Sequence, residues 1–146
     1  MSTLELRDVA VSYGRREALV PFSETVRSGE WLGLIGPNGA GKSSLLRAIV
    51  GVVEARGDVL VDGVSLASCS RRRRAALVAY VPQSPTIPDD MTGFEYVLLG
   101  RSPYIGYFGT ERREDKEKAA AVLERLELQD FAQRRLGALS GGERQR

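Results

Sequence analysis

The sequence predicts an α/β fold, or an α+β fold with a helical insertion, and three features lead to this prediction. Short apolar stretches bounded by turn residues, the pattern of β-strands, fill most of the first 90 residues. One glycine-rich loop joins such a stretch to a helical pattern, and beyond Asp90 apolar residues recur at helical spacing. Strands with one crossover helix, followed by a helical block, are typical of these two fold classes.

Strand patterns recur through the first 83 residues. Residues 3–12 mostly alternate between apolar and polar side chains, and a second stretch follows around residues 22–26. Residues 31–36 and 77–83 are nearly continuous apolar runs, which favours buried strands. An Asp-Gly pair at residues 62–63 separates two further short strands and predicts a tight turn between them.

Three helices are expected. The first follows the glycine-rich loop and ends at Gly51, a residue typical of helix C-termini. The second begins at Thr92, where Glu95 three residues later completes a capping box. The third lies within residues 111–128 and carries an apolar face among charged residues. That face consists of Ala119, Val122, Leu123 and Leu126.

Composition describes an ordinary globular domain. The 146 residues suffice for one domain with a real core, and 21 basic against 19 acidic residues give a net charge of +2. This balance does not indicate a nucleic-acid binder. The single cysteine, Cys69, cannot form an internal disulfide and suits a reducing compartment. No apolar run approaches the roughly 18 to 20 residues of a membrane span, and the N-terminus lacks a signal peptide, so we expect a cytoplasmic protein.

The sequence "GPNGAGKS", residues 36–43, fits the phosphate-binding pattern G-x-x-x-x-G-K-[ST] without a mismatch. Its glycines allow the backbone amides to turn inward around a phosphate, and the following helix adds a positive N-terminus. Lys42 can reach the β- and γ-phosphates, and the Ser43 hydroxyl can bind Mg²⁺. The alternative is a glycine-rich turn that merely joins two elements. Because the loop follows a strand pattern and opens a helix, it predicts nucleoside triphosphate binding.

The sequence "LSGGERQR", residues 139–146, resembles the signature motif of the ATP-binding-cassette (ABC) ATPases. It can also be read as a helix cap in which Ser140 and Glu143 form a capping box, and the two roles are compatible. The resemblance implies that this loop caps the γ-phosphate of an ATP held by the P-loop of a second subunit, across a dimer interface. It assigns this role to Leu139, Ser140, Gly141, Gly142 and Glu143.

Two other residues match the same family in chain order. Tyr13, in "VSYG", stands where the family has an aromatic that stacks on adenine; a core aromatic is the alternative. Gln83, in "YVPQ", stands where the family has a glutamine that contacts Mg²⁺, the attacking water and the membrane partner; a solvated loop glutamine is the alternative. The resemblance thus implies catalytic roles for Lys42 and Gln83 and a Mg²⁺ site at Ser43 and Gln83. It implies nucleotide contacts by Tyr13, Gly36, Pro37, Asn38, Gly39, Ala40, Gly41, Lys42, Ser43 and Ser44.

The resemblance also implies a finer architecture. It predicts a RecA-like P-loop NTPase core with an N-terminal antiparallel β part in residues 1–90, a helical subdomain in residues 91–138 and the signature in residues 139–146. Family members carry a Walker B strand beyond the signature, ending in an aspartate for Mg²⁺ and a catalytic glutamate, and then a histidine. This sequence has no histidine and ends at Arg146, so we expect a chain truncated before Walker B. Alone, it should bind ATP poorly and not hydrolyse it.

The segment "LLGRSPYIGYFG", residues 98–109, is similar to the "LGR-x-P" segment of importers for iron–siderophore, haem and cobalamin, although Tyr104 stands where that group often has histidine. Five of the ten aromatic residues fall within residues 94–108, a density that indicates a minor core or a partner-binding surface.

The resemblance implies ATP and Mg²⁺ as cofactors. It implies a membrane permease and a second ATPase subunit as partners, an indirect link to a periplasmic or surface substrate-binding protein, and a location at the inner face of the membrane.

The sequence is also compatible with two other functions. One is a soluble ABC-type ATPase that acts on nucleic acid or ribosomes, and another is a nucleotide-binding module that does not hydrolyse. The basic run from Arg71 to Arg74 could suggest nucleic-acid binding, but a solvated basic helix turn fits the near-neutral charge better. We therefore expect no nucleic-acid partner.

Overall fold

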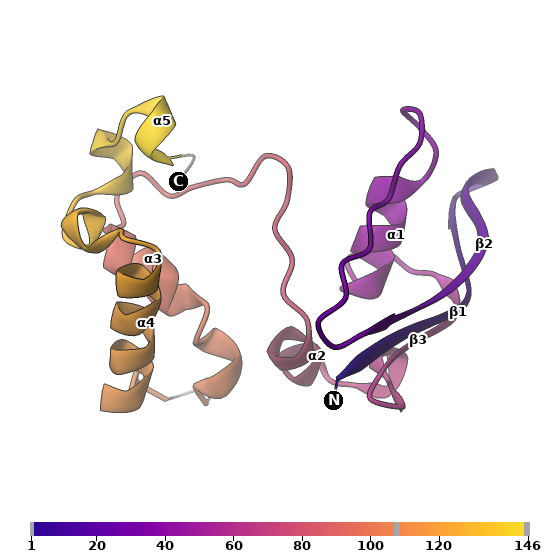
Figure 1. Ribbon diagram of the computed structural model, residues 1–146, viewed down its shortest axis with the longest axis horizontal. Coiled ribbons are helices and arrows are strands. Elements are labelled where there is room, and N and C mark those ends of the chain that lie inside the picture. Colours follow the sequence, from indigo (N-terminus) through magenta and orange to yellow (C-terminus); the bar gives the residue numbers. More distant parts are fainter. Residues whose placement is uncertain (1, 107–108, 145–146) are drawn as a thin grey trace. The chain divides into compact units, whose positions relative to one another are not determined.

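The computed structural model describes residues 2–106 and 109–144. The chain forms two compact units, one ending at Tyr80 and the other beginning at Val81. The first unit contains the strands and two helices, and the second is helical (Figure 1). This mixture of strands and helices confirms the predicted α/β class. Among the described residues, no helix combines the length and apolar character needed to cross a bilayer.

A four-stranded antiparallel sheet is the centre of the first unit. Its strands are β1 (Thr3–Tyr13), β2 (Arg16–Arg27), β3 (Arg56–Val61) and β4 (Val64–Ser65), in the order β2-β1-β3-β4. The turn between β3 and β4 has positive φ at Asp62 (52°) and Gly63 (75°), as a two-residue hairpin turn requires. The strands predicted for residues 3–12, for residues 22–26 and around residues 62–63 are therefore confirmed, with β2 longer than expected.

Helix α1 (Lys42–Ile49) covers one face of this sheet. Its buried residues Leu45, Ala48 and Ile49 pack against Val9, Val11 and their neighbours, and both valines are 0% exposed. The helix ends before Gly51, whose φ of 71° stops the right-handed helical path. The predicted helix and its C-terminal glycine are confirmed.

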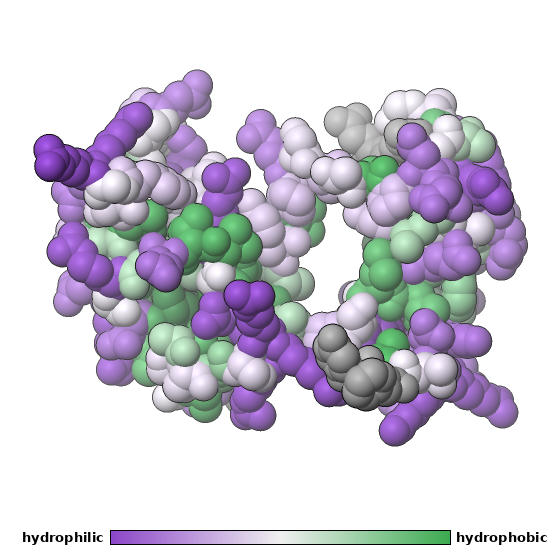
Figure 2. Space-filling model, turned by 180° about the vertical axis from the view of Figure 1, so that it is seen from behind, coloured by the Kyte–Doolittle hydropathy of each residue, from purple (hydrophilic) through white to green (hydrophobic). Residues whose placement is uncertain are grey.

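Two predicted strands are wrong. Residues 31–36 and 77–83 form no strand, and Trp31, Ile35 and Val81 are 99%, 98% and 87% exposed. A strand persists only where a neighbouring strand satisfies its backbone groups, and neither run is paired with another segment in the described part of the chain. Apolar residues therefore reach the surface of both units (Figure 2).

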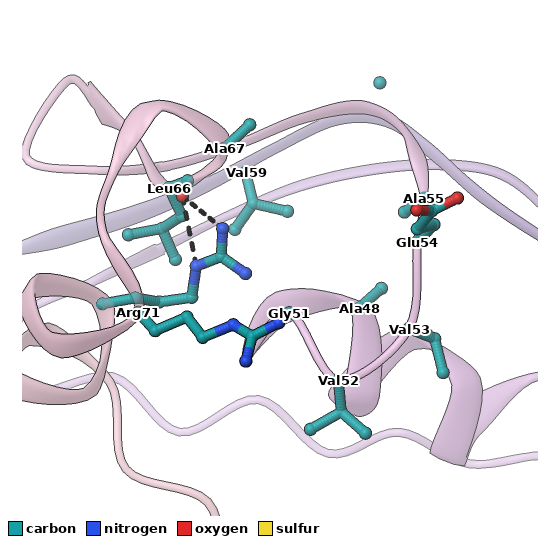
Figure 3. Close-up of a pocket in the computed structure, with 12 residues that line it drawn as sticks. Ala48, Gly51, Val52, Val53, Glu54, Ala55, Val59, Leu66, Ala67 and Arg71 are labelled. Carbon is teal, nitrogen blue, oxygen red and sulfur yellow. Dashed lines mark hydrogen bonds between the residues drawn. The ribbon is translucent and has the colours of Figure 1, made fainter.

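The basic run forms helix α2 (Arg71–Leu77), with the Ser70 hydroxyl as its N-terminal cap. The guanidinium of Arg74 donates twice to the carbonyl of Leu66, at 3.1 and 2.6 Å. The same guanidinium lies against Gly51 at the end of α1, beside a pocket of about 530 Å³ that Arg71 also lines (Figure 3). Arg74 thus packs α2 against its own unit. The basic run is a short helix, as the interpretation as a basic helix turn predicts.

The second unit is built from α3 (Gly93–Leu99), α4 (Arg113–Arg125), α5 (Gly141–Arg144) and short 3₁₀ turns. The capping box at α3 is present, because Thr92 Oγ1 accepts from Glu95 N and Glu95 accepts from Thr92 N. Helix α4 buries a narrower face than predicted. Ala119 and Leu123 are buried, whereas Val122 and Leu126 are 45% and 57% exposed.

An ion pair fixes the segment that resembles "LGR-x-P". Arg101 Nε donates to Asp115 Oδ1 over 2.9 Å, and Asp115, on α4, is only 6% exposed. This hydrogen bond from Arg101 lowers the pKa of Asp115. The Arg101 guanidinium also lies 3.9 Å from the centre of the Tyr104 ring, which remains 52% exposed. Arginine thus anchors the segment to α4 while Tyr104 stays accessible; Tyr107 and Phe108 lie outside the described residues.

Candidate nucleotide-binding site

The glycine-rich loop makes a tight turn into α1. Ala40 N donates to Pro37 O over 3.2 Å, and Leu45 N donates to Gly41 O over 2.8 Å as the helix begins. Gly39 and Gly41 have φ of 86° and 88°, a region that residues with a Cβ rarely adopt. Pro37 and Asn38, like Gly39 and Ala40, are exposed on the loop.

Gly41 is restricted by its surroundings as well as by its backbone. A Cβ at this position would lie 2.5 Å from Ala18 O and 3.0 Å from Leu19 Cδ1. The loop therefore packs directly on β2, and no side chain fits between them. This contact fixes where the first turn of α1 begins.

The start of α1 is suited to an anion. Among residues 2–106 and 109–144 no side chain caps it, and its first turn contains no acidic residue. The first amides of a helix have no partner within the helix and carry the positive end of its dipole. The loop thus presents free donors and a positive potential at one place, the arrangement that binds phosphate.

Lys42 and Ser43 lie at this end of α1. Lys42 Nζ donates to Gly36 O over 2.6 Å and to Pro37 O over 2.8 Å, so the ammonium lies over the loop. Within the part of the chain that the structure describes, the third of its three hydrogens has no acceptor. Ser43 is exposed, and its hydroxyl makes no hydrogen bond within the described residues. Ser44 follows it, half-buried.

The side chains available as metal ligands limit how Mg²⁺ could bind at the start of α1. The described residues contain no group of three carboxylate, cysteine or histidine side chains that could bind a metal ion. Mg²⁺ commonly keeps several waters and takes phosphate oxygens beside one or two protein oxygens. The Ser43 hydroxyl fits one such position, so the residues of this unit suit a metal that arrives together with a phosphate.

Tyr13 ends β1 and is 47% exposed, so it is not a core aromatic. Its hydroxyl interacts with Arg47 of α1, whose pKa is raised by hydrogen bonds to Tyr80 and Tyr13. The sequence gives no indication that Arg47 lies beside Tyr13. The only available signal was its position on the same helix as Lys42, which alone predicts no contact with Tyr13.

The remaining predicted residues belong to the second unit. Gln83 is exposed in the loop before α3. In the signature, Ser140 N donates to Glu143 Oε2 over 2.7 Å, and Glu143 N donates to Ser140 Oγ over 3.3 Å. This is the predicted capping box. Leu139 is 9% exposed, whereas Gly141 and Gly142 are open, because a Cβ added to either glycine would have no described atom within 4 Å.

Glu143 has a further partner that the sequence did not indicate. Arg134 Nη1 donates to Glu143 Oε1 over 2.8 Å. The hydrogen bonds from Ser140 and then Arg134 lower the pKa of Glu143 from 4.5 to about 2. The carboxylate is therefore ionised throughout the physiological pH range.

The family model of ABC transporters matches residues 19–146 of this chain. The chain belongs to the ABC transporter family. The family that the signature predicted is thereby confirmed.

Relatives of this ABC chain include proteins named as ATP-binding proteins of import and transport systems. It is 40% identical over 145 residues to the hemin import ATP-binding protein HmuV of Myxococcus xanthus, covering 99% of this chain and 54% of the relative. It is 34% identical over 147 residues to the probable siderophore transport system ATP-binding protein YusV of Bacillus subtilis, covering 100% of this chain and 54% of the relative. The chain therefore spans about half the length of the curated relatives it matches.

Solved structures agree with this assignment. A nucleotide-free ATP-binding cassette from an ABC transporter superposes with a TM-score of 0.80 at 28% identity, covering 99% of this chain and 61% of that chain. The ADP conformation of MJ1267, another ATP-binding cassette of an ABC transporter, has the same TM-score, identity and coverage. The resemblance therefore extends to the backbone of the cassette.

Proposed function

We propose that this chain is the ATP-binding part of an ABC importer subunit. The observation that carries the proposal is the uncapped start of α1, where Lys42 and the loop amides are arranged for phosphate, in a chain that also contains the signature. The names of the relatives, which include ATP-binding proteins of hemin and siderophore import, support it.

In this proposal each unit has a separate task. In the first unit, Tyr13 stacks on adenine, residues 36–44 bind the phosphates and Ser43 contributes a hydroxyl to Mg²⁺. The metal, when bound, neutralises charge on the β- and γ-phosphates. Lys42 binds phosphate oxygens as a mobile point charge.

In the second unit, Gln83 orients the attacking water near Mg²⁺ and contacts the membrane partner. Residues 139–143 bind the γ-phosphate of an ATP held by a second copy of the subunit. Ser140 contributes a hydroxyl, and the open glycines contribute exposed amides.

At the level of the whole protein, we propose that ATP hydrolysis drives uptake through a membrane permease, with the subunit at the inner face of the membrane. The cargo class is a chelated metal or cofactor such as an iron chelate, haem or cobalamin. A periplasmic or surface protein would deliver it to the permease. The relatives include a manganese transport protein as well, so their names do not agree on one cargo.

The test is ATP binding and hydrolysis by the complete subunit with its permease, comparing Lys42→Ala with the control Lys116→Ala on α4. A charge-assisted hydrogen bond to phosphate contributes about 1.5–3 kcal/mol, so Lys42→Ala should weaken ATP binding about 10- to 100-fold and abolish turnover. The control should behave as the unaltered protein. Equal activity of the two variants would contradict the proposal.

A further inference from the structure

A short segment of the second unit is tied along the start of α3 by backbone hydrogen bonds. We call residues 131–137 the strap. Four of its backbone contacts are hydrogen bonds to residues 89–94, with lengths from 2.8 to 3.1 Å. They are Gly93 N to Arg134 O, Phe94 N to Ala132 O, Leu136 N to Met91 O and Gly137 N to Asp89 O. Thr92 and Arg135 also form an antiparallel bridge.

The strap and the start of α3 are in direct backbone contact. A Cβ on Gly93 would lie 2.6 Å from Phe131 O, and a Cβ on Gly137 would lie 2.8 Å from Asp89 O. Both contacts are with backbone atoms, which cannot rotate away as a flexible side chain can. A shift of the start of α3 must therefore carry the strap with it.

The Arg134 side chain connects the strap to the signature. Its Nη1 lies 2.8 Å from Glu143 Oε1, and its guanidinium lies 5.4 Å from the centre of the Phe131 ring. The Phe131 ring restricts the Arg134 guanidinium on one side, and the ion pair with Glu143 directs the guanidinium toward α5. The side chains of Arg134 and Glu143 remain 44% and 32% exposed, so solvent weakens but does not remove their attraction.

Glu143 in turn determines how Ser140 can act. One carboxylate oxygen accepts from Arg134 and the other from Ser140 N. Ser140 Oγ accepts from Glu143 N, and the Ser140 hydroxyl also interacts with the Glu143 carboxylate, which helps to lower the pKa of Glu143. A hydroxyl has one hydrogen to donate, so the position of the Glu143 carboxylate determines whether that hydrogen points to Glu143 or to a phosphate oxygen.

We propose that Arg134 is a positioning residue that transmits the placement of α3 to Ser140. It does not touch the nucleotide itself; it fixes the Glu143 carboxylate, which fixes the Ser140 backbone and hydroxyl. A partner that displaces the start of α3 would thereby move the phosphate-capping loop. This inference rests on the proposed function, because it assigns the loop a nucleotide to cap.

The test uses the complete subunit assembled with its permease and compares Arg134→Gln, Arg134→Lys and Arg113→Gln. Arg113 is a matched control, since it pairs with Glu117 over 2.7 Å on the exposed side of α4. We expect Arg134→Gln to lower kcat for ATP hydrolysis at least about fivefold with KM for ATP changed less than about twofold, because the P-loop of the other unit is untouched. Arg134→Lys should restore part of kcat, and the control should leave both constants unchanged.

A double-mutant cycle with Glu143→Gln distinguishes positioning through Glu143 from general destabilisation. If Arg134 acts through Glu143, Arg134→Gln has little further effect on kcat in the Glu143→Gln background. Additive losses, or an unchanged kcat in Arg134→Gln, would overturn the inference while the proposed function stands. If the unaltered complex does not hydrolyse ATP, the proposed function fails and this inference fails with it.

Discussion

Glu143 shows how local hydrogen bonds can set the charge state of one residue. The folded-state pKa is lowered from 4.5 to about 2 by donors from Ser140 and Arg134. A lowered carboxyl pKa stabilises the folded state fully above the unfolded value, and that stabilisation is lost as the pH falls toward the folded value. The capping box should therefore weaken between about pH 4.5 and about pH 2.

This pH dependence can be measured by following the carboxyl carbon of Glu143 by NMR during an acid titration. We expect a midpoint near 2, and a higher midpoint in Arg134→Gln because the positively charged donor is replaced by a neutral amide. Ser140→Ala is the companion variant, since it removes the hydroxyl contact but keeps the backbone donor of residue 140. A midpoint near 4.5 in the unaltered chain would show that these hydrogen bonds do not persist in solution.

Single residues also show what the sequence could and could not predict about the site. The capping box of Ser140 and Glu143 was predictable because its members are three residues apart and interact within one turn. Arg134 was not, because its contact with Glu143 depends on the strap and thus on hydrogen bonds to residues 89–94. Arg47 and Tyr13 likewise meet only when α1 packs beside β1.

At the scale of an element, the phosphate-binding loop offers a test that separates backbone strain from steric contact. Gly39 and Gly41 have nearly equal positive φ, but only Gly41 lies against β2. Gly39→Ala should cost about 1–2 kcal/mol of unfolding free energy from strain alone. Gly41→Ala should cost about 1–3 kcal/mol more, because its methyl group must displace Ala18 O.

Urea unfolding followed by circular dichroism measures both costs, with Gly39→Ala as the matched control. Gly41→Ala should also weaken ATP binding more than Gly39→Ala, because displacement of the loop from β2 moves the first amides of α1. Equal destabilisation by the two variants would mean that the loop does not pack on β2 as described.

Turns and helix caps can be predicted from a few adjacent residues, whereas a strand also needs a partner strand that is distant in sequence. The turn at residues 62–63 and the cap at Thr92 were correctly predicted from a few adjacent residues. Residues 31–36 and 77–83 were wrongly predicted as strands, since an apolar run indicates burial but does not supply the neighbouring strand that burial requires. The strands β1 to β4 all lie within the first 65 residues, so each has a neighbouring strand to pair with inside this stretch.

At the scale of the whole molecule, the exposed apolar runs have a direct spectroscopic consequence. Trp31 is the only tryptophan of the chain and is 99% exposed. Exposed apolar stretches of this kind commonly mark surfaces that another part of a protein or a partner covers. In the 146-residue chain, Trp31 should emit at the wavelength of tryptophan in water and be quenched freely by acrylamide.

The emission wavelength and acrylamide quenching of Trp31 can then be compared between the 146-residue chain and the complete subunit. Emission there should move to shorter wavelength, and quenching should fall, if further residues pair with residues 31–36 and bury Trp31. The chain unfolded in guanidinium supplies the reference for full exposure. Short-wavelength, protected emission from the 146-residue chain itself would contradict the structure, because it would mean that residues 31–36 already have a partner within this chain.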